Sequence, residues 1–359
     1  MKVLYVVLND LGRKDSGSGV RPNCMLQAFR ERGHELYVLS GSQDFDHAKS
    51  RKEAVEKALA WLKDNRPDFC YIESSTYPIL NHCDYQLIRY LHKEKIPSSY
   101  FYRDIYRMLP GQAVDTRKGW KNRLKDRALH LLQLHTDRML HKLDVVYFPG
   151  QGYADYFHYK RTELLPPGGD VKFIPEHPCT KTCIYVGGLS DYYGYPLMME
   201  AFRLLNAGEE TYKLILVCRE DEYQKHCSGK ELPDWLEVHH ASGDALVPLY
   251  ARADAGLLAL SYNEYGHLCI GIKLFQYLSY GLPVVSTNVK TMGAIIRENE
   301  FGVVAEPNAQ DYAEAIRSLL NEEQLRSYRR KIEASLSQRH LWVHRVDKIV
   351  EDMTGVRPE

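Results

Sequence analysis

Short apolar runs alternate with amphipathic stretches along most of this 359-residue chain. The apolar runs predict β-strands, and the stretches between them, in which apolar residues recur at helical spacing, predict α-helices. This alternation is typical of βαβ units and predicts a parallel, doubly wound sheet. In the first half we expect strands at Val3–Leu8, Glu35–Ser40, Phe69–Glu73, Ser99–Tyr102 and Val145–Phe148, and helices near Asn23–Arg32, Lys49–Asn65, Tyr85–Glu94 and Lys121–Lys142.

The alternation is interrupted at Leu164–Asp170, a Pro- and Gly-rich segment with linker composition. It then restarts, and a chain of this length fits two domains. We therefore expect an N-terminal domain over 1–168, a second doubly wound domain over 169–338, and a helix over 339–359. The second domain is expected to contain strands at Cys183–Val186, Lys213–Cys218, Leu236–His239, Gly256–Leu260, Pro283–Ser286 and Gly302–Ala305.

The composition is that of a globular enzyme, with 44% apolar and 26% charged residues and a formal net charge of zero. A chain without net charge lacks the overall positive electrostatic potential that would attract nucleic acid. The eight cysteines include no CxxC pair and the histidines no HxH or HExxH spacing, so we expect reduced thiols and no metal site. The opening apolar run, Met1–Leu8, is too short for a signal peptide or a membrane span, which predicts a cytoplasmic protein.

The segment 272–286 predicts a helix that ends at Gly281 and leads into a buried strand at Val284–Val285. Its apolar face is formed by Leu274, Phe275 and Leu278, and one turn earlier by Cys269 and Ile270. Lys273 and Gln276 lie on one face near the start of this helix. A helix N-terminus, a lysine charge and an amide side chain together suit a phosphate and its sugar. The alternative is a solvated Lys and Gln on an ordinary helix.

Parallel sheets bind ligands outside the carboxyl ends of their strands, so two such domains that face each other form a cleft between strand-end loops. On the second-domain side, Gly187 and Gly188 follow the first strand and allow close approach of a diphosphate to backbone amides. Arg219, His240 and Glu264 follow later strands, and Glu264 is suited to accept hydrogen bonds from sugar hydroxyls. Because His239 and His240 point to opposite faces of a strand, we expect one to be packed and one to lie near the cleft.

On the first-domain side, Gly17-Ser18-Gly19 lies in a long loop that runs to Pro22. Gly19 permits close backbone approach to a ligand, and Arg21 either supplies positive charge there or is simply solvated. We expect both residues to contribute to donor binding. The nicotinamide-cofactor motif requires a third glycine where Asn23 stands, so a dehydrogenase is disfavoured. We interpret the glycine pair as a mobile lip over the cleft.

A charged pair, Arg103-Asp104, stands at the carboxyl end of a predicted strand. An acid at this place is well positioned to act as a general base for a hydroxyl, which makes Asp104 the candidate catalytic residue. Glu73, at the end of the neighbouring strand, is the competing carboxylate, and Arg103 is the neighbouring acceptor-side cation. The alternative is an Arg-Asp pair that caps the strand end.

The segment 117–142 carries eight Lys or Arg against Asp126 and Asp137, with Trp and Leu interspersed. A basic amphipathic helix of this kind suits an anionic membrane surface. An ordinary helix with its leucines inward and a solvated basic face is the alternative. A nucleic-acid partner is disfavoured because no aromatic-basic sheet motif accompanies the helix.

Three segments resemble the glycosyltransferases of the GT-B fold, which consists of two facing Rossmann-like domains. They are Tyr185-Val186-Gly187-Gly188-Leu189, Arg252–Leu258 and Lys273–Val285. His340-Leu341-Trp342 resembles the start of the closing helix, which in GT-B enzymes returns to the first domain. The resemblance implies an α/β fold, a nucleoside-diphosphate sugar as donor, and no required metal.

The chain departs from glycosyltransferase family 4 at informative positions. Gly188 and Tyr193 stand where that family has its phosphate-binding Arg and Lys, and Gln276 replaces its second glutamate. Lys273 and Gln276 instead resemble the Lys-x-x-Gln of the xanthan-type glucuronosyltransferases, family 70. This likeness implies that Lys273 neutralises phosphate, that Gln276 contacts sugar or ribose, and that Asp104 is the base. Family 4 retains and family 70 inverts stereochemistry, so both outcomes stay open.

The expected function is transfer of a sugar from a nucleoside diphosphate, with uridine diphosphate (UDP) as the expected carrier, to a hydroxyl of a lipid-linked glycan in exopolysaccharide, capsule or cell-wall synthesis. The enzyme would act in the cytoplasm, at the inner face of the membrane. Two alternatives are a sugar-nucleotide 2-epimerase and a sugar-nucleotide-binding protein without turnover. The donor sugar, the acceptor, the linkage and the oligomeric state do not follow from these residues.

Overall fold

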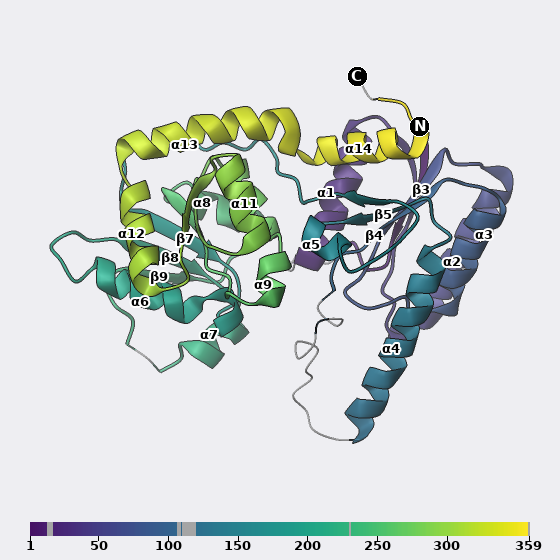
Figure 1. Cartoon of the computed structure of the whole chain (residues 1–359), viewed down its shortest axis with the longest axis horizontal. Coiled ribbons are helices and arrows are strands. Elements are labelled where there is room, and N and C mark those ends of the chain that lie inside the picture. The colour runs from purple at the N-terminus through teal and green to yellow at the C-terminus, as the bar shows by residue number, and fades with distance from the viewer. Residues whose placement is uncertain (13–16, 106–108, 110–119, 230, 358–359) are drawn as a thin grey trace. The chain divides into compact units, whose positions relative to one another are not determined.

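The computed structural model describes residues 1–12, 17–105, 109, 120–229 and 231–357. The chain forms two compact units (Figure 1). The N-unit consists of Met1–Pro166 with Trp342–Glu359, and the C-unit consists of Pro167–Leu341. Each unit has its own parallel sheet and its own core.

The sheet of the N-unit has six parallel strands in the order β2-β1-β3-β4-β5-β6. All residues of β3, β4 and β5 are buried, so both faces of this part of the sheet are covered. The strands are β1 (Lys2–Val7), β2 (Glu35–Leu39), β3 (Phe69–Glu73), β4 (Ser98–Phe101), β5 (Val145–Phe148) and β6 (Thr162–Leu164).

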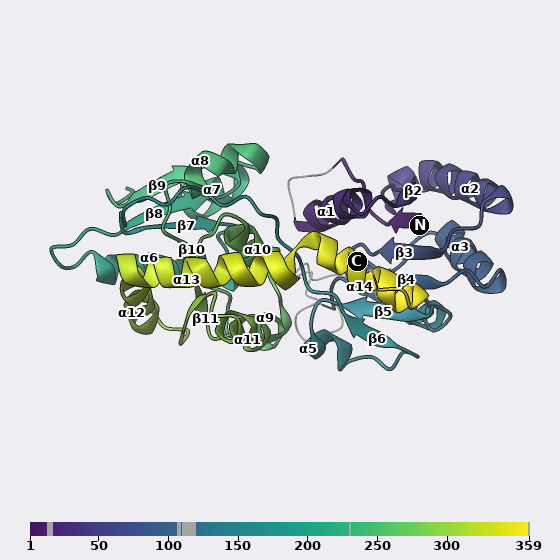
Figure 2. The same cartoon turned by 90° about the horizontal axis from the view of Figure 1, so that it is seen from above.

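The helices of the N-unit are α1 (Gly17–Glu31), α2 (Ala48–Asp64), α3 (His82–Lys93), α4 (Trp120–Leu140), α5 (Gln151–Ala154) and α14 (Trp342–Thr354), with a 3₁₀ turn at Phe45–His47. The C-terminal helix α14 packs beside α1 (Figure 2). Its apolar residues Trp342, Val346, Ile349 and Val350 are buried, and ion pairs join Arg32 to Asp347 and Arg161 to Asp352. The expected return of the C-terminal helix to the first domain is confirmed.

The sheet of the C-unit also has six parallel strands, in the order β12-β11-β10-β7-β8-β9. Numbered within the unit, this is the 3-2-1-4-5-6 order of the Rossmann fold, read from the other edge. The strands are β7 (Thr182–Val186), β8 (Lys213–Val217), β9 (Leu236–His239), β10 (Ala255–Leu258), β11 (Val284–Thr287) and β12 (Gly302–Ala305).

Two apolar clusters cover the two faces of this sheet. One contains the buried residues of α6 (Tyr195–Leu205) and α12 (Ala309–Leu319), which lie side by side. The partly buried Tyr223 of α7 (Glu220–His226) packs against this cluster. The other contains those of α8 (Val247–Tyr250), α10 (Ile272–Ser279) and α11 (Lys290–Glu298). The remaining elements are α9 (Glu264–Leu268), α13 (Glu322–Ser335), 3₁₀ turns at Asp191–Tyr193 and Gly243–Leu246, and a π-helical turn at Leu336–His340.

The fold class predicted from the sequence is confirmed, with two local corrections. The helix expected to extend back to Cys269 and Ile270 begins instead at Ile272, because Gly271 is extended and caps it. The loop expected to run to Pro22 is shorter, because Gly17–Gly19 form the first turn of α1 and Pro22 lies inside that helix. The Asn23 side chain donates to the Gly19 carbonyl at 2.8 Å, which supports this turn. Residues 13–16 of that loop lie outside the described residues.

Candidate active site

The order of the strands in the C-unit places a topological switch point between β7 and β10. The chain leaves β7 toward β8 on one side, and it leaves β10 toward β11 on the other. Ligands of open α/β sheets bind outside the carboxyl ends of the strands at such a point. The segments that follow these two strands are the glycine turn Gly187–Gly188 and the loop that leads through α9 to α10.

Lys273 lies in the first turn of α10 and is partly buried. Burial lowers the pKa of its ammonium group to about 8, and no carboxylate among the described residues offsets this effect. One turn along, Gln276 has a buried side-chain oxygen, Oε1, without a hydrogen-bond partner. The site therefore holds a desolvated cation and an unused polar group at a helix N-terminus, an arrangement that an anionic ligand would stabilise.

Tyr277 connects this helix to the glycine turn. Its hydroxyl accepts a hydrogen bond at 2.9 Å from the backbone amide of Val186, the last residue of β7. The Tyr277 ring also fills the space over Gly256, where an added Cβ would meet a ring atom at 2.4 Å. Because Lys273 precedes Tyr277 by one helical turn, the two side chains share a face of α10, and that face is directed toward the end of β7.

Tyrosines pack closely around the glycine turn. A Cβ on Gly187 would approach the Tyr185 hydroxyl to 2.5 Å, and one on Gly188 would approach the Tyr193 ring to 2.8 Å. The Gly187 amide already donates to the Val217 carbonyl at 3.0 Å, so that amide would have to leave the strand pairing to meet a diphosphate. A neighbouring tyrosine, Tyr192, reaches the second loop, with its hydroxyl 3.2 Å from Cys269 Sγ.

The other donor-side candidates also lie at the carboxyl edge of this sheet. Arg219 precedes α7, is exposed, and lies within 3.3 Å of Glu222 Oε1. His240 follows β9, and its Nε2 lies 2.8 Å from Glu220 Oε2. Glu264 begins α9 and is exposed. Arg219 and His240 thus each have a carboxylate partner, whereas Lys273 has none among the described residues.

The histidine pair at the end of β9 differs from expectation. His239 is partly buried, with Nε2 2.6 Å from Glu237 Oε1, and His240 is the more exposed of the two. Neither side chain is buried in the core, because both find carboxylate partners at the rim of the sheet.

In the N-unit, three predicted residues come together at the carboxyl edge of the sheet. Arg21, from α1, is 4% exposed and donates from Nε to Glu73 Oε1 at 3.1 Å, so a solvated Arg21 is ruled out. Glu73 is fully buried at the end of β3, and its Oε1 also accepts from the Tyr71 hydroxyl at 2.6 Å. Arg103 follows β4, with Nη2 3.8 Å from Glu73 Oε2. Gly19 is buried in the first turn of α1.

Asp104 follows Arg103 in the segment after β4 and is partly buried. It therefore lies at the carboxyl edge of the N-unit sheet, and its role as a general base stays a prediction. Because Glu73 is enclosed and engaged by Arg21 and Tyr71, it is a poorer candidate for proton transfer than Asp104.

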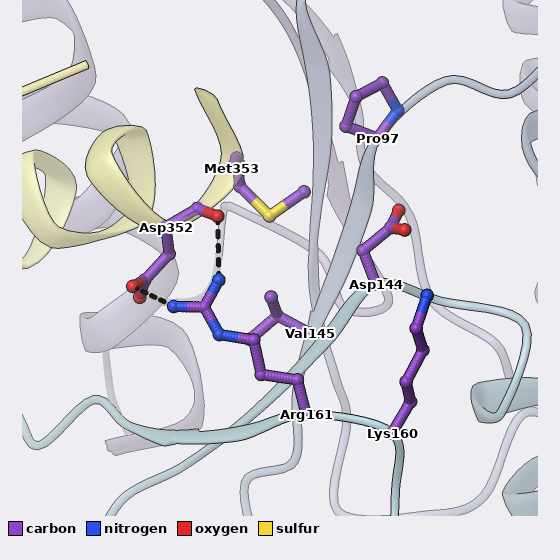
Figure 3. A pocket seen from close by; sticks show the side chains of 7 residues that line it. All are labelled: Pro97, Asp144, Val145, Lys160, Arg161, Asp352 and Met353. Atoms are coloured by element: carbon purple, nitrogen blue, oxygen red, sulfur yellow. Dashed lines mark hydrogen bonds and ion pairs between the residues drawn. The ribbon is translucent and has the colours of Figure 1, made fainter. Parts of the chain in front are cut away.

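A pocket of about 530 Å³ opens at the amino ends of β4, β5 and β6, the edge opposite Asp104 (Figure 3). Its polar groups serve the packing of α14: Arg161 donates to the Asp352 carboxylate at 2.6 Å and to its carbonyl at 3.0 Å. Asp144 accepts from the Ser98 amide at 2.9 Å. In the C-unit, a pocket of about 420 Å³ lies at the carboxyl edge between the end of β10 and the turn Asp191–Tyr193, beside the switch point.

Two further features bear on ligands. Within the described residues, no group of three or more His, Cys, Asp or Glu side chains is placed to hold a metal ion. No helix in the described part of the chain is long and apolar enough to cross a membrane.

Sequence reasoning missed Tyr277 and Arg345. Tyr277 follows Lys273 by four residues, so helical spacing could have indicated it. Arg345 lies in α14, is 8% exposed, and its pKa is lowered by burial and then by the charge of Arg21. The sequence carried no comparable signal for Arg345, because its neighbourhood depends on how α14 packs in the N-unit.

Comparisons with known proteins agree with this fold. Residues 172–335 match the family described as Glycosyl transferases group 1. No curated protein matches the chain. Among solved structures, a glycosyltransferase from Rickettsia africae ESF-5 has a TM-score of 0.69 at 11% identity and covers 99% of this chain and 98% of its own.

Two other solved structures extend the comparison. Anabaena Alr3699/HepE in complex with UDP has a TM-score of 0.67 at 14% identity, with 99% of this chain and 100% of that chain covered. WaaG, a glycosyltransferase involved in lipopolysaccharide biosynthesis, has a TM-score of 0.63 at 16% identity, with the same coverage. The chain therefore has the fold of the GT-B glycosyltransferases, and residues 172–335 of its C-unit match the family Glycosyl transferases group 1.

Proposed function

We propose that this enzyme transfers a sugar from a UDP-sugar donor to a hydroxyl of a lipid-linked glycan. The observation that carries the donor side is the partly buried Lys273 at the N-terminus of α10, which lacks a carboxylate among the described residues. HepE, which has the same fold, has been solved with UDP and with UDP-glucose. The negative charge of a nucleoside diphosphate is complementary to the positive charge of Lys273.

The proposed chemistry places the donor diphosphate against Lys273 and the first amides of α10. When the sugar–oxygen bond breaks, negative charge grows on the departing diphosphate, and a preorganised cation and helix N-terminus stabilise it. Bound diphosphate also favours the protonated form of Lys273, which burial disfavours in the free enzyme. Gln276, with its unpartnered Oε1, is positioned to hydrogen-bond a sugar or ribose hydroxyl.

Asp104 is the proposed base on the acceptor side. In an inverting reaction its carboxylate would take the proton of the attacking hydroxyl, which forms the new bond to the sugar as the bond to diphosphate breaks. A retaining reaction would use no side-chain base. The two mechanisms therefore differ in their dependence on Asp104.

The exposed side chains of helix α4 are the evidence for an acceptor that is linked to a lipid. Trp120, Leu124, Leu131 and Leu134 are 72%, 62%, 66% and 42% exposed, and their spacing places them on one face of the helix. Arg127 and Arg138 fall on the same face. The expectation that the leucines point inward is wrong for these three, because the inward positions belong to residues such as Thr136 and Leu140. Residues 117–119 of the predicted basic segment lie outside the described residues.

An exposed apolar stripe with arginines beside it is suited to the interface of an anionic bilayer. We therefore propose that α4 holds the enzyme at the membrane surface where a lipid-linked acceptor resides. The first part of α4 projects away from the sheet of the N-unit, as this role requires (Figure 1).

The function is tested with radiolabelled UDP-sugars and defined polyprenyl-diphosphate-linked sugars in vesicles. Transfer predicts label in the lipid fraction with wild-type enzyme, loss of that label with Lys273→Ala, and its retention with Lys213→Ala, which removes a lysine at the amino end of β8. A labelled sugar nucleotide that is converted to its epimer without acceptor would identify an epimerase instead. Binding of UDP-sugars without any turnover would identify a regulatory binding protein.

A further inference from the structure

Two arginines of the N-unit approach one buried carboxylate, as far as the described ion pairs show. Arg21 and Arg103 both approach Glu73, with nearest nitrogen–oxygen distances of 3.1 and 3.8 Å. The side chains of Arg21 and Glu73 are 5% and 0% exposed, and that of Arg103 is 13% exposed. One buried carboxylate thus faces two guanidinium groups, which is costly in a low-dielectric interior unless a further anion balances them.

The hydrogen-bond donors of these arginines are incompletely used. Arg21 Nη1 and Arg103 Nε and Nη2 are buried and have no hydrogen-bond partner among the residues that the structure describes. A guanidinium group carries five N–H donors in a planar fork that matches two oxygens of a carboxylate or phosphate. Glu73 Oε2 is also buried without a hydrogen-bond partner, 3.8 Å from Arg103 Nη2. Three unused donor atoms therefore face one unused oxygen, and because buried polar groups in native proteins are almost always satisfied, this excess of donors favours an oxygen-bearing ligand.

The surroundings hold the two guanidinium groups in place. The Arg21 guanidinium carbon lies 3.5 Å from the centre of the Phe101 ring and 5.7 Å from that of Trp342. Arg345, one turn after Trp342 on α14, is also buried, and Arg21 adds to the positive potential around it. Three arginines from α1, α14 and the segment after β4 therefore contribute to one electropositive region.

The region lies where a ligand is expected. In the order β2-β1-β3-β4, the chain leaves β1 toward β2 and leaves β3 toward β4, so the switch point of this sheet lies between β1 and β3. Glu73 ends β3, and Arg21 belongs to the helix that follows β1. Ligands of open parallel sheets bind at this position.

We propose that Arg21 and Arg103 bind an oxyanion, a phosphate or carboxylate group, carried by the acceptor substrate. Glu73 holds Arg21 in place, and Arg103, the more exposed of the two, meets the anion first. The assignment of this anion to the acceptor rests on the proposed transferase function. The acceptor hydroxyl would then be positioned by a charged group on its own molecule, on the same sheet edge as Asp104.

The test separates this site from the donor site by working in Lys273→Ala protein, which lacks the cation proposed for UDP. Melting temperature and calorimetric affinity are measured with inorganic phosphate and with acetate, against chloride at equal ionic strength. We expect one of the two anions to bind Lys273→Ala protein and to lose roughly tenfold or more in affinity when Arg103→Gln is added. Arg161→Gln, at the opposite edge of the same sheet, is the matched control and should keep the affinity.

Binding of phosphate identifies a phosphate-bearing acceptor, and binding of acetate alone identifies a carboxylate-bearing one. Failure of both anions to bind, or affinity that does not depend on Arg103, would overturn the proposal. UDP binding to the single variant Arg103→Gln reports that the protein is folded and that its donor site is intact. Loss of anion binding on addition of Arg103→Gln, with UDP binding retained in the single variant, therefore supports the anion site. Anion binding that persists while UDP binding is lost would refute the anion site and would not argue against the Lys273 donor site.

Discussion

The backbone amide of Val186 donates a hydrogen bond to the hydroxyl of Tyr277 across 2.9 Å. Strand β10 pairs with β7 at Cys183 and Ile184, so Val186 lies beyond that pairing and its amide is satisfied by a side chain instead. The bond joins the end of β7 to the middle of α10. It thereby ties the helix that carries Lys273 to the turn that carries Gly187 and Gly188.

Removing this hydroxyl should weaken the C-unit. Tyr277→Phe leaves a buried amide without a partner, and we expect the free energy of unfolding to fall by about 1–3 kcal/mol. The control is Tyr250→Phe, because the Tyr250 hydroxyl is buried without a partner and its loss should cost little. Urea denaturation measures both. Equal losses in the free energy of unfolding for the two substitutions would show that the Tyr277–Val186 hydrogen bond does not stabilise the C-unit.

Removing the Lys273 ammonium should weaken UDP binding. The lost charge-assisted contact predicts a roughly ten- to hundredfold loss of affinity for Lys273→Ala, measured by calorimetry. Lys213→Ala serves as the control, since that side chain stands at the amino end of β8. Unchanged UDP affinity in Lys273→Ala would refute the proposed phosphate site.

The affinity for UDP should fall as the pH rises above about 8, the pKa of Lys273 in the free enzyme. The protonated ammonium binds the diphosphate, and above this pKa a proton must be taken up before binding, at a cost that grows with pH. The terminal phosphate is already ionised in this range and adds no opposing slope. Calorimetry between pH 7 and 10 measures the effect, and Lys273→Arg, which stays charged, should flatten the profile.

The inverting and retaining mechanisms differ in their need for Asp104 as a base. If the enzyme inverts, Asp104→Asn should lower turnover about 10²- to 10⁴-fold and leave UDP affinity unchanged, because a general base acts on the acceptor and not on the donor. Asp155→Asn, an exposed substitution at the end of α5, is the control. Steady-state turnover that hardly changes in Asp104→Asn would exclude this base and favour retention.

Membrane binding should depend on the exposed leucines of α4. Leu124→Gln with Leu131→Gln is expected to weaken binding to vesicles that contain anionic lipid, by roughly tenfold or more for each leucine that enters the interface. Phe45→Gln removes a 90% exposed apolar side chain from another part of the N-unit and should have no effect. Vesicle flotation measures the difference. Equal flotation of the α4 variant and the wild type would remove α4 from the proposal.

Several features of the fold could be predicted because they depend on neighbours in the sequence. The apolar runs of β3, β5, β9 and β12 coincide with the predicted strands. Gly281 has the predicted left-handed conformation, with φ of 77°, and ends the chain reversal after α10. Strand β6 was missed, because its three residues are partly exposed and carry no run of apolar positions.

The sequence allowed us to predict individual residues of the candidate site, but not their positions relative to one another. Lys273 and Gln276 could be paired in advance because helical spacing places them on one face. The start of their helix at Ile272 could not be predicted, because the apolar residues Cys269 and Ile270 continue the helical pattern toward the N-terminus. In the structure Gly271 interrupts this pattern and caps the helix. That break places Lys273 in the first turn, where the helix dipole favours an anion.

Local sequence therefore determined the order of strands and helices, their caps, and the residue types at the strand ends. The tertiary structure alone decided which strand ends are neighbours. Arg21, Glu73 and Arg103 are separated by many residues in the chain, and they meet because β1, β3 and β4 are adjacent in the sheet. Arg345 feels the charge of Arg21 because α14 packs against α1. That adjacency results from burial of apolar surface between distant segments, a driving force without direction along the chain, and no local spacing records it.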